Sequence, residues 1–258
     1  MDLKLKNKVA FIAGSSRGIG QGIAAAFLEE GCKTVITGRD KLALNRAKEI
    51  FEEKFGDEKV MAIGVDLSKE ADLKKALNDT IEKWGQLDCI VISIGSGKST
   101  SGWVINNEEW NRVLDLNVGT SVRIATAALS FIKKTKIGSI VFIASIAGLE
   151  TTQAPLAYSA AKAALVNYAS NLSRLVAEYG IRVNCVAPGN ILFPGGSWES
   201  HIQQREKEVH AYIRNEVPQN RFGTVEEIAD VVTFLSSERA SFVTGACWVV
   251  DGGQTRTF

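Results

Sequence analysis

Short runs of branched apolar residues alternate with longer amphipathic segments along the whole chain. We expect the runs to be strands at 9–13, 34–37, 60–65, 88–94, 139–144, 181–187 and 246–250. The segments between them predict helices at 18–30, 40–55, 69–84, 107–133, 155–179 and 224–236, with Asn107 capping the fourth. Apolar runs without polar alternation are typical of parallel strands buried on both faces. The order therefore predicts an α/β fold, a doubly wound seven-stranded parallel sheet with helices on both faces.

One stretch interrupts the alternation. Between the sixth strand and the last helix lie residues 190–219, hereafter the 190–219 segment, which contain Phe193-Pro194-Gly195-Gly196 and a charged helical stretch at 197–215. We find no linker, repeat or low-complexity segment and expect a single domain over residues 1–258. Within it, the 190–219 segment is predicted to be a substrate loop or lid, or equally a plain amphipathic surface helix.

The charge balance and composition exclude several classes of protein. Lys plus Arg number 30 and Asp plus Glu number 29, so a net charge of +1 gives no electrostatic reason to bind nucleic acid or an anionic membrane. There is no apolar run of about 18 residues and no apolar core behind the N-terminal charges, so we expect a cytoplasmic protein. Four dispersed cysteines suggest reduced thiols, and two isolated histidines suggest no metal site.

A glycine-rich loop follows the first predicted strand and opens the first predicted helix. It reads Gly14-Ser15-Ser16-Arg17-Gly18-Ile19-Gly20. Glycines permit a tight turn and a close approach of the backbone to a ligand. The helix N-terminus presents free N–H groups and a positive dipole end, which together bind a pyrophosphate. This context predicts a Rossmann-type dinucleotide site.

Tyr158 and Lys162 lie four residues apart in a predicted helix, so their side chains share one face. A phenol has a pKa of about 10 and is a weak acid–base group at neutral pH. An ammonium group within about 4–6 Å favours the phenolate and lowers that pKa. The pair can therefore transfer a proton to or from an alcohol or ketone oxygen.

The glycine spacing, with Tyr158 and Lys162 far downstream, resembles the short-chain dehydrogenase/reductase family of the classical type, in particular its 3-oxoacyl-[acyl-carrier-protein] reductase-like members. Further matches extend over almost the whole chain. They are Asp66-Leu67, Asn117, Ser145, Pro188-Gly189, Arg221-Phe222-Gly223, Phe242-Val243-Thr244-Gly245 and Val250-Asp251-Gly252-Gly253. This resemblance implies an NAD(P)-dependent oxidoreductase acting on CH–OH or C=O groups.

The resemblance also implies roles for individual residues. Tyr158 would be the general acid or base, Lys162 would lower its pKa and hold the nicotinamide ribose, and Ser145 would donate to the substrate oxygen. Asn117 would hold a water that links Lys162 to solvent. The implied cofactor-binding residues are Gly14, Ser16, Arg17, Gly18, Ile19, Gly20, Arg39, Asp66, Leu67, Ser93, Gly95, Asn117, Tyr158, Lys162, Pro188, Gly189 and Ile191.

The end of the second predicted strand bears on the choice of cofactor. An acid there selects NAD(H), whereas arginine accommodates the 2′-phosphate of NADP(H). The family's selecting acid would fall at Gly38, Arg39 follows it, and Arg17 lies in the glycine loop. We interpret Asp40 as a helix N-cap. Two guanidinium groups can hold a phosphate, so we predict a preference for NADP(H) over NAD(H).

Three positions depart from the family pattern: Ala13, Ser93 within Ile92-Ser93-Ile94-Gly95, and Phe193 after the Pro-Gly pair. They bear on cofactor affinity and geometry more than on the chemistry. Substrate-site candidates are the loop at 95–103, residues 147–150, and the 190–219 segment with Trp198.

The expected substrate is a ketone or secondary alcohol, either a 3-oxoacyl thioester or a hydroxylated small molecule such as a sugar. By resemblance the chain would form a homotetramer or homodimer. The alternative function is a non-catalytic NADP-binding sensor or scaffold of the same fold.

Overall fold

The computed structural model describes residues 1–135 and 138–256. Seven strands form one sheet in the order β3-β2-β1-β4-β5-β6-β7, and every neighbouring pair is parallel. Their bounds are β1 Val9–Ala13, β2 Lys33–Gly38, β3 Val60–Gly64, β4 Cys89–Ile92, β5 Gly138–Ile143, β6 Ile181–Pro188 and β7 Cys247–Val250. The predicted doubly wound Rossmann sheet is confirmed, because the strand order reverses between β1 and β4.

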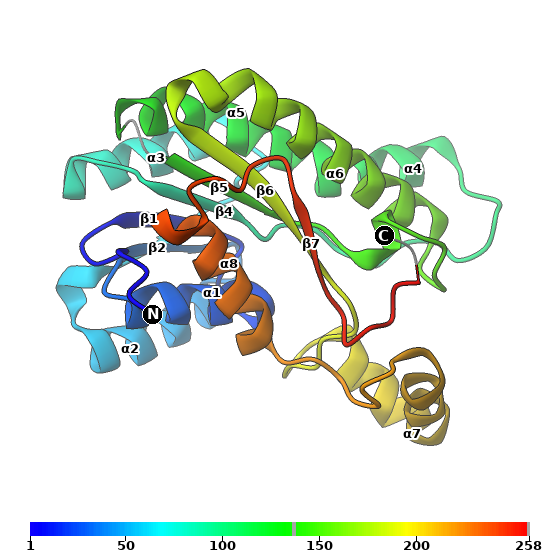
Figure 1. Ribbon diagram of the computed structural model, residues 1–258. Coiled ribbons are helices and arrows are strands. Elements are labelled where there is room, and N and C mark those ends of the chain that lie inside the picture. Colours follow the sequence, from blue (N-terminus) through cyan, green and yellow to red (C-terminus); the bar gives the residue numbers. More distant parts are fainter. Residues whose placement is uncertain (136–137, 257–258) are drawn as a thin grey trace.

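Helices cover both faces of the sheet (Figure 1). On one face lie α3 (Glu70–Trp84), α5 (Thr120–Ile132) and α6 (Leu156–Val176), whose apolar residues share a core with Phe11, Ile90 and Phe142. On the other lie α1 (Gly18–Glu29), α2 (Lys41–Phe55) and α8 (Val225–Ser236). The strands read as continuous apolar runs because both faces are buried in this way.

The fourth predicted helix is not continuous. It consists of α4 (Asn107–Leu114), a π-helical turn (Asp115–Gly119) and α5. Its N-cap is Asn106, not Asn107, because Asn106 is extended and its Oδ1 accepts from Glu109 N at 2.8 Å. The π-helical turn widens the helix around Asn117, and such turns are frequent at functional sites.

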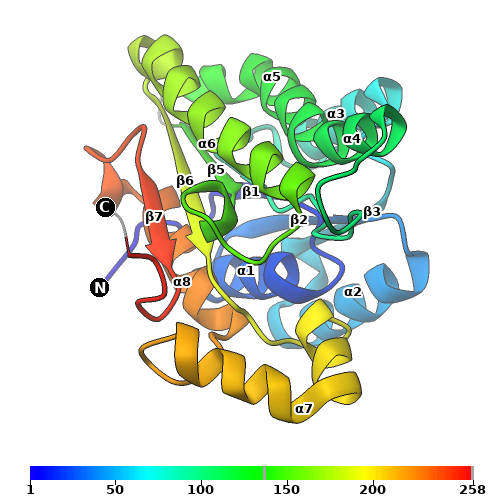
Figure 2. The same cartoon turned by 90° about the vertical axis from the view of Figure 1, so that its right-hand side faces the viewer.

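The 190–219 segment forms the remaining helix, α7 (Ser197–Glu216), which lies beyond α1 and α8 at one edge of the molecule (Figure 2). Arg205 has non-helical angles and kinks α7 in its middle. No helix in the described part of the chain is long and apolar enough to cross a membrane.

Candidate functional site

The glycine loop joins β1 to α1 and leaves the start of the helix open. Gly14 and Gly18 have φ of +78° and +58°, which favour glycine. The N-cap of α1 is Arg17, whose side chain makes no capping hydrogen bond, and the first turn contains no acidic residue. The first N–H groups of α1 thus keep their positive potential for an anion.

Two buried side chains that the sequence analysis did not identify hold this loop. The Ser15 hydroxyl donates to the Ile12 carbonyl at 2.7 Å and accepts from Thr37 N at 2.9 Å. The Thr37 hydroxyl accepts from Gly14 N at 3.0 Å and donates to the same Ile12 carbonyl at 3.2 Å. The loop is therefore tied to the end of β2 on its inner side, while its outer side stays accessible.

Arg39, directly after β2, and Arg17, in the glycine loop, are both exposed. Gly38 leaves room for Ser16, since a Cβ on Gly38 would lie 2.7 Å from the Ser16 Cβ. Asp40 caps α2 by accepting from Leu42 N and Ala43 N, as the sequence predicted. Its carboxylate is therefore engaged at the helix, which leaves Arg39 as the charged group at the strand end.

Asp66 and Leu67 follow β3. The Asp66 carboxylate accepts from Ser68 N at 3.2 Å and from the Ser68 hydroxyl at 2.8 Å. These bonds lower the pKa of Asp66, first through the Ser68 hydroxyl, and the charge of Arg39 acts in the same direction. Leu67 is buried in the core. Asp66 and Arg39 thus lie near one another at the same end of the sheet.

Lys162 is buried on α6 beside the end of β5. Its Nζ donates to the Ile143 carbonyl at 2.8 Å. A Cβ on Gly95 would come within 3.2 Å of this nitrogen and would overlap Asn117 Oδ1, so Gly95, Asn117 and Lys162 meet in one place. Burial lowers the pKa of Lys162 to about 8.

Tyr158 is half-buried one turn before Lys162, whose Nζ lies 5.7 Å from the centroid of the phenol ring. Burial raises the pKa of Tyr158, and a hydrogen bond with Ser145 opposes that rise. In the chain without a cofactor, the pKa of Tyr158 is therefore not lowered, in contrast to the prediction. The ammonium group of Lys162 donates to the Ile143 carbonyl instead. Ser145 also accepts from Ala147 N at 3.2 Å, which fixes its hydroxyl at the end of β5.

Asn117 is fully buried, and its side chain is bonded to the loop after β4. Its Oδ1 accepts from Ser96 N at 3.0 Å, and its Nδ2 donates to the carbonyls of Val113 at 3.0 Å and Ser96 at 3.3 Å. Ser93 contributes a backbone N–H to the Ala13 carbonyl at 3.0 Å. Asn117 thereby positions the backbone between Ser93 and Ser96 beside Lys162.

The chain after β6 reaches back to the glycine loop. Gly189 N donates to the Val250 carbonyl at 3.0 Å, and Ile191 is buried and forms a bridge with Gly223. A Cβ on Gly18 would lie 2.6 Å from the ring of Phe193. Arg17 Nη1 donates to the Gly195 carbonyl at 3.3 Å. Phe193 and Gly195 thus connect the 190–219 segment directly to the glycine loop.

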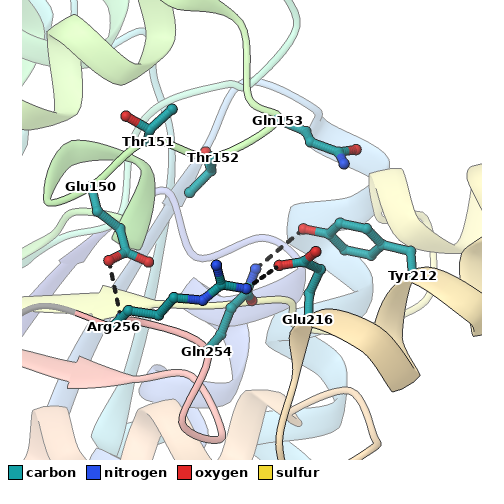
Figure 3. Close-up of a pocket in the computed structure, with 8 residues that line it drawn as sticks. All are labelled: Glu150, Thr151, Thr152, Gln153, Tyr212, Glu216, Gln254 and Arg256. Carbon is teal, nitrogen blue, oxygen red and sulfur yellow. Dashed lines mark hydrogen bonds and ion pairs between the residues drawn. The ribbon is translucent and has the colours of Figure 1, made fainter.

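A pocket of about 450 Å³ lies at the same end of the sheet (Figure 3). Its lining comes from the loop after Ser145, from α7 and from the C-terminal tail: Glu150, Thr151, Thr152, Gln153, Tyr212, Glu216, Gln254 and Arg256. Ser145, Tyr158 and Lys162 are adjacent to this lining in the chain and are not part of it. Glu150 and the α7 region were predicted from the sequence as candidates for the substrate site, whereas residues 151–153 and the C-terminal tail were not.

The two tryptophans proposed for the substrate site have other surroundings. Trp198 stacks on Tyr212 with centroids 5.5 Å apart, and its ring also meets Phe222 at 5.4 Å. Trp198 therefore packs against a residue of the pocket, Tyr212, and is not itself part of the lining. Trp103 is 86% exposed and lies outside the pocket lining. In the described residues, no group of three His, Cys, Asp or Glu side chains is arranged to hold a metal ion.

The comparisons with known proteins agree with this geometry. A family model described as enoyl-(acyl carrier protein) reductase matches residues 13–255. The 3-oxoacyl-[acyl-carrier-protein] reductase of Chlamydia muridarum is 34% identical over 257 residues, covering 98% of this chain and 99% of that protein. Among solved structures, L-sorbose reductase from Gluconobacter frateurii, complexed with NADPH and L-sorbose, has a TM-score of 0.92 at 30% identity and full coverage of both chains. A 7α-hydroxysteroid dehydrogenase complexed with NADH has a TM-score of 0.90 at 27% identity, covering 99% of this chain and 97% of that chain.

Proposed function

The chain belongs to the short-chain dehydrogenase/reductase family, whose members are oxidoreductases that act on CH–OH or C=O groups and bind a nicotinamide cofactor, and on this premise we propose that it interconverts a ketone and a secondary alcohol with NADP(H). The observation that carries the proposal is the convergence of Ser145, Tyr158 and Lys162 beside Gly95 in the loop after β4.

Tyr158 is proposed as the proton donor in reduction and the acceptor in oxidation. Ser145, which already interacts with the phenol, donates to the substrate oxygen and holds it against Tyr158. Lys162, whose buried ammonium has a depressed pKa, supplies positive charge on the same helix face. Asn117 acts through the backbone at Ser96 and is a positioning residue.

The residues around the glycine loop fit a dinucleotide. The uncapped start of α1 offers free N–H groups to a pyrophosphate, and Gly18 lets the backbone approach it closely. Ser16, Gly20, Asp66, Leu67, Gly95, Pro188 and Ile191 complete the proposed cofactor-binding set. When bound, the nicotinamide supplies or accepts the hydride. The Phe193 ring lies against Gly18 and therefore borders the proposed phosphate-binding loop.

The proposed preference for NADP(H) depends on Arg39 and Arg17. Solved relatives contain either NADPH or NADH, so the preference has to come from this chain's own residues. Both guanidinium groups are exposed at the end of the sheet, and Asp40 is engaged as an N-cap. Arg39 beside a side-chain-free Gly38, with Arg17 in the glycine loop as a second cation, favours a phosphate over a hydroxyl.

Steady-state kcat/KM with NADPH and with NADH tests this proposal. We expect NADPH to be preferred. Arg39→Asp should reduce the ratio of kcat/KM with NADPH to kcat/KM with NADH about 10- to 100-fold, because one charge-assisted contact is lost. Arg46→Asp is the matched control, since it makes the same charge change at an exposed position on α2. A wild-type preference for NADH would contradict the proposal.

We also propose that the protein is a homotetramer or homodimer. The sheet ends in β7, where Trp248 and Val249 are 37% and 41% exposed, and Phe242 nearby is fully exposed. An edge strand with exposed apolar side chains favours association with a second copy. Light scattering of the purified protein should give at least twice the mass of one chain, and a monomer would refute this part of the proposal.

A further inference from the structure

Every residue that lines the pocket near the proposed catalytic residues carries a hydrogen-bonding side chain, and from this we infer that the substrate is a polyhydroxylated carbonyl compound or the corresponding polyol, recognised by the carboxylates of Glu150 and Glu216. The inference rests on the proposed oxidoreductase function and narrows its substrate class. Of the two substrate classes predicted from the sequence, the inference favours the hydroxylated small molecule over the 3-oxoacyl thioester.

The lining offers hydrogen-bonding groups from every residue. Two carboxylates, three hydroxyls, two amides and one guanidinium belong to the eight residues Glu150, Thr151, Thr152, Gln153, Tyr212, Glu216, Gln254 and Arg256. Small-molecule sites of about 300–1,000 Å³ are usually lined mainly by apolar and aromatic side chains. An acyl chain placed here would desolvate these polar groups without replacing their bonds to water. A molecule with several hydroxyls can replace those bonds.

Arg256 crosses the pocket between the two carboxylates (Figure 3). Its backbone N donates to Glu150 Oε2 at 3.0 Å, and its guanidinium Nη2 donates to Glu216 Oε2 at 3.3 Å. On the same wall, Gln254 Nε2 donates to the Tyr212 hydroxyl at 3.2 Å. These contacts tie the C-terminal tail to the loop after Ser145 and to α7, and they orient the acceptors before a ligand arrives.

The charge of the lining sets the kind of ligand. Two carboxylates against one guanidinium leave one negative charge in excess, and this disfavours a phosphate or a carboxylate on the substrate. Ionised carboxylates are acceptors only and form strong bonds with hydroxyl donors. A carboxylate has two oxygens and can accept from two neighbouring hydroxyls of one substrate. The lining therefore fits a neutral ligand rich in hydroxyl donors.

The pocket lining is linked to the proposed catalytic residues through the chain. Thr151, Thr152 and Gln153 lie in the short segment between Ser145 and Tyr158. The start of that segment is fixed on α6, because a Cβ on Gly148 would lie 2.5 Å from the carbonyl carbon of Lys162. On the other side, Asn190 at the end of β6 donates to Gln254 at 2.7 Å. A substrate with its carbonyl at Tyr158 would thus extend its hydroxyls into the pocket.

The test compares three substrates under NADPH-dependent reduction: D-fructose, 2-hexanone, and the acetoacetyl thioester of N-acetylcysteamine. We expect the highest kcat/KM for fructose. Glu216→Gln keeps the size of the side chain and removes the charge, and it should reduce kcat/KM for fructose about tenfold while changing that for 2-hexanone less than about twofold. Glu206→Gln, the same substitution at an exposed position of α7, should change neither.

A second measurement does not depend on turnover. Calorimetric titration of the NADP⁺-bound protein with sorbitol should give binding that Glu216→Gln weakens about tenfold. Preferred turnover of the thioester or of 2-hexanone, or equal losses for all three substrates in Glu216→Gln, would overturn the inference and leave the oxidoreductase function intact. The absence of sorbitol binding would overturn it as well. Failure of every carbonyl substrate despite NADPH binding would instead count against the proposed function.

Discussion

Two regions of the proposed site are built in different ways. One is the catalytic cluster of Ser145, Tyr158, Lys162 and Asn117, and the other is the α7 wall, which consists of α7 and the tail residue Arg256 that contacts it. Lys162 and Asn117 are buried, and their side chains donate to main-chain carbonyls of β5 and of α4, respectively. The wall depends on Trp198, a kinked helix and contacts between exposed side chains such as Arg256 and Glu216. The groups proposed for the reaction are thus fixed by the fold's core, whereas the groups proposed for substrate selection lie on a part that can change without disturbing the core.

The largest effect should come from the catalytic cluster. Tyr158→Phe removes the proposed proton donor and keeps the ring, so we expect kcat to fall about 10²- to 10⁴-fold. NADPH affinity, measured by fluorescence titration, should remain close to that of the wild type because the glycine loop is untouched. Near-normal turnover in this variant would show that another group transfers the proton. The buried cluster would then not be the part of the site that carries out the reaction.

The buried ammonium of Lys162 predicts a pH-dependent stability. Its pKa of about 8 in the folded chain lies below the ordinary value of 10.5, so the unfolded chain binds more protons between those values. The sign follows: the cost of burying the charge is complete below pH 8 and is lost as the pH rises toward 10.5. At one pKa unit per 1.36 kcal/mol, the difference is about 3 kcal/mol.

Urea unfolding of the cofactor-free wild type and of Lys162→Met at pH 7, 8.5 and 10 measures this effect. The free energy of unfolding of the wild type should rise with pH relative to that of the variant, which has no group titrating at this position. A constant difference across the three pH values would mean that the ammonium is not desolvated.

The strands could be predicted because burial on both faces makes each of them a continuous apolar run. The proposed catalytic residues Tyr158 and Lys162 could be singled out because their four-residue spacing is local in the sequence. The break at Asp115–Gly119 escaped prediction, since the helical pattern continues through it and the widening depends on Asn117 reaching the loop after β4.

The pocket wall was less accessible from the sequence. Glu150, Glu216 and Arg256 belong to three distant parts of the chain, and only the tertiary fold brings them together. Trp198 was a candidate for lining the substrate site, but its ring packs on Tyr212 and Phe222 and it is not part of the pocket lining. Ser15 and Thr37 carry no motif signal, because hydroxyls that brace a loop resemble any other serine or threonine in a strand or turn.

A smaller effect should come from the bracing of the glycine loop. Ser15→Ala leaves the buried Thr37 N–H without its partner, which should cost about 1–3 kcal/mol of unfolding free energy. Ser130→Ala, at an exposed position of α5, is the control and should change stability by less than about 0.5 kcal/mol. Equal effects of the two substitutions in urea unfolding would indicate that the loop is held by its backbone alone.

The smallest effect on global stability should come from the α7 wall. Trp198→Leu removes three aromatic contacts, with His201, Tyr212 and Phe222, of about 0.5–1.5 kcal/mol each. These contacts hold a segment at the edge of the molecule that can open locally. We expect the urea midpoint to be nearly unchanged. Cleavage within residues 190–219 by a protease should become several-fold faster. The KM of the carbonyl substrate should rise about two- to tenfold, because Tyr212 loses the ring that packs against it.

Phe142→Leu is the matched substitution in the core, where Phe142 is fully buried against Tyr168. It should lower the free energy of unfolding by about 1–3 kcal/mol and leave the proteolysis of residues 190–219 unchanged, because its contacts break only when the sheet unfolds. If both substitutions lowered global stability by the same amount, α7 would be part of the cooperative core. Substrate selection and folding would then be coupled, and the wall could not vary independently of the catalytic cluster.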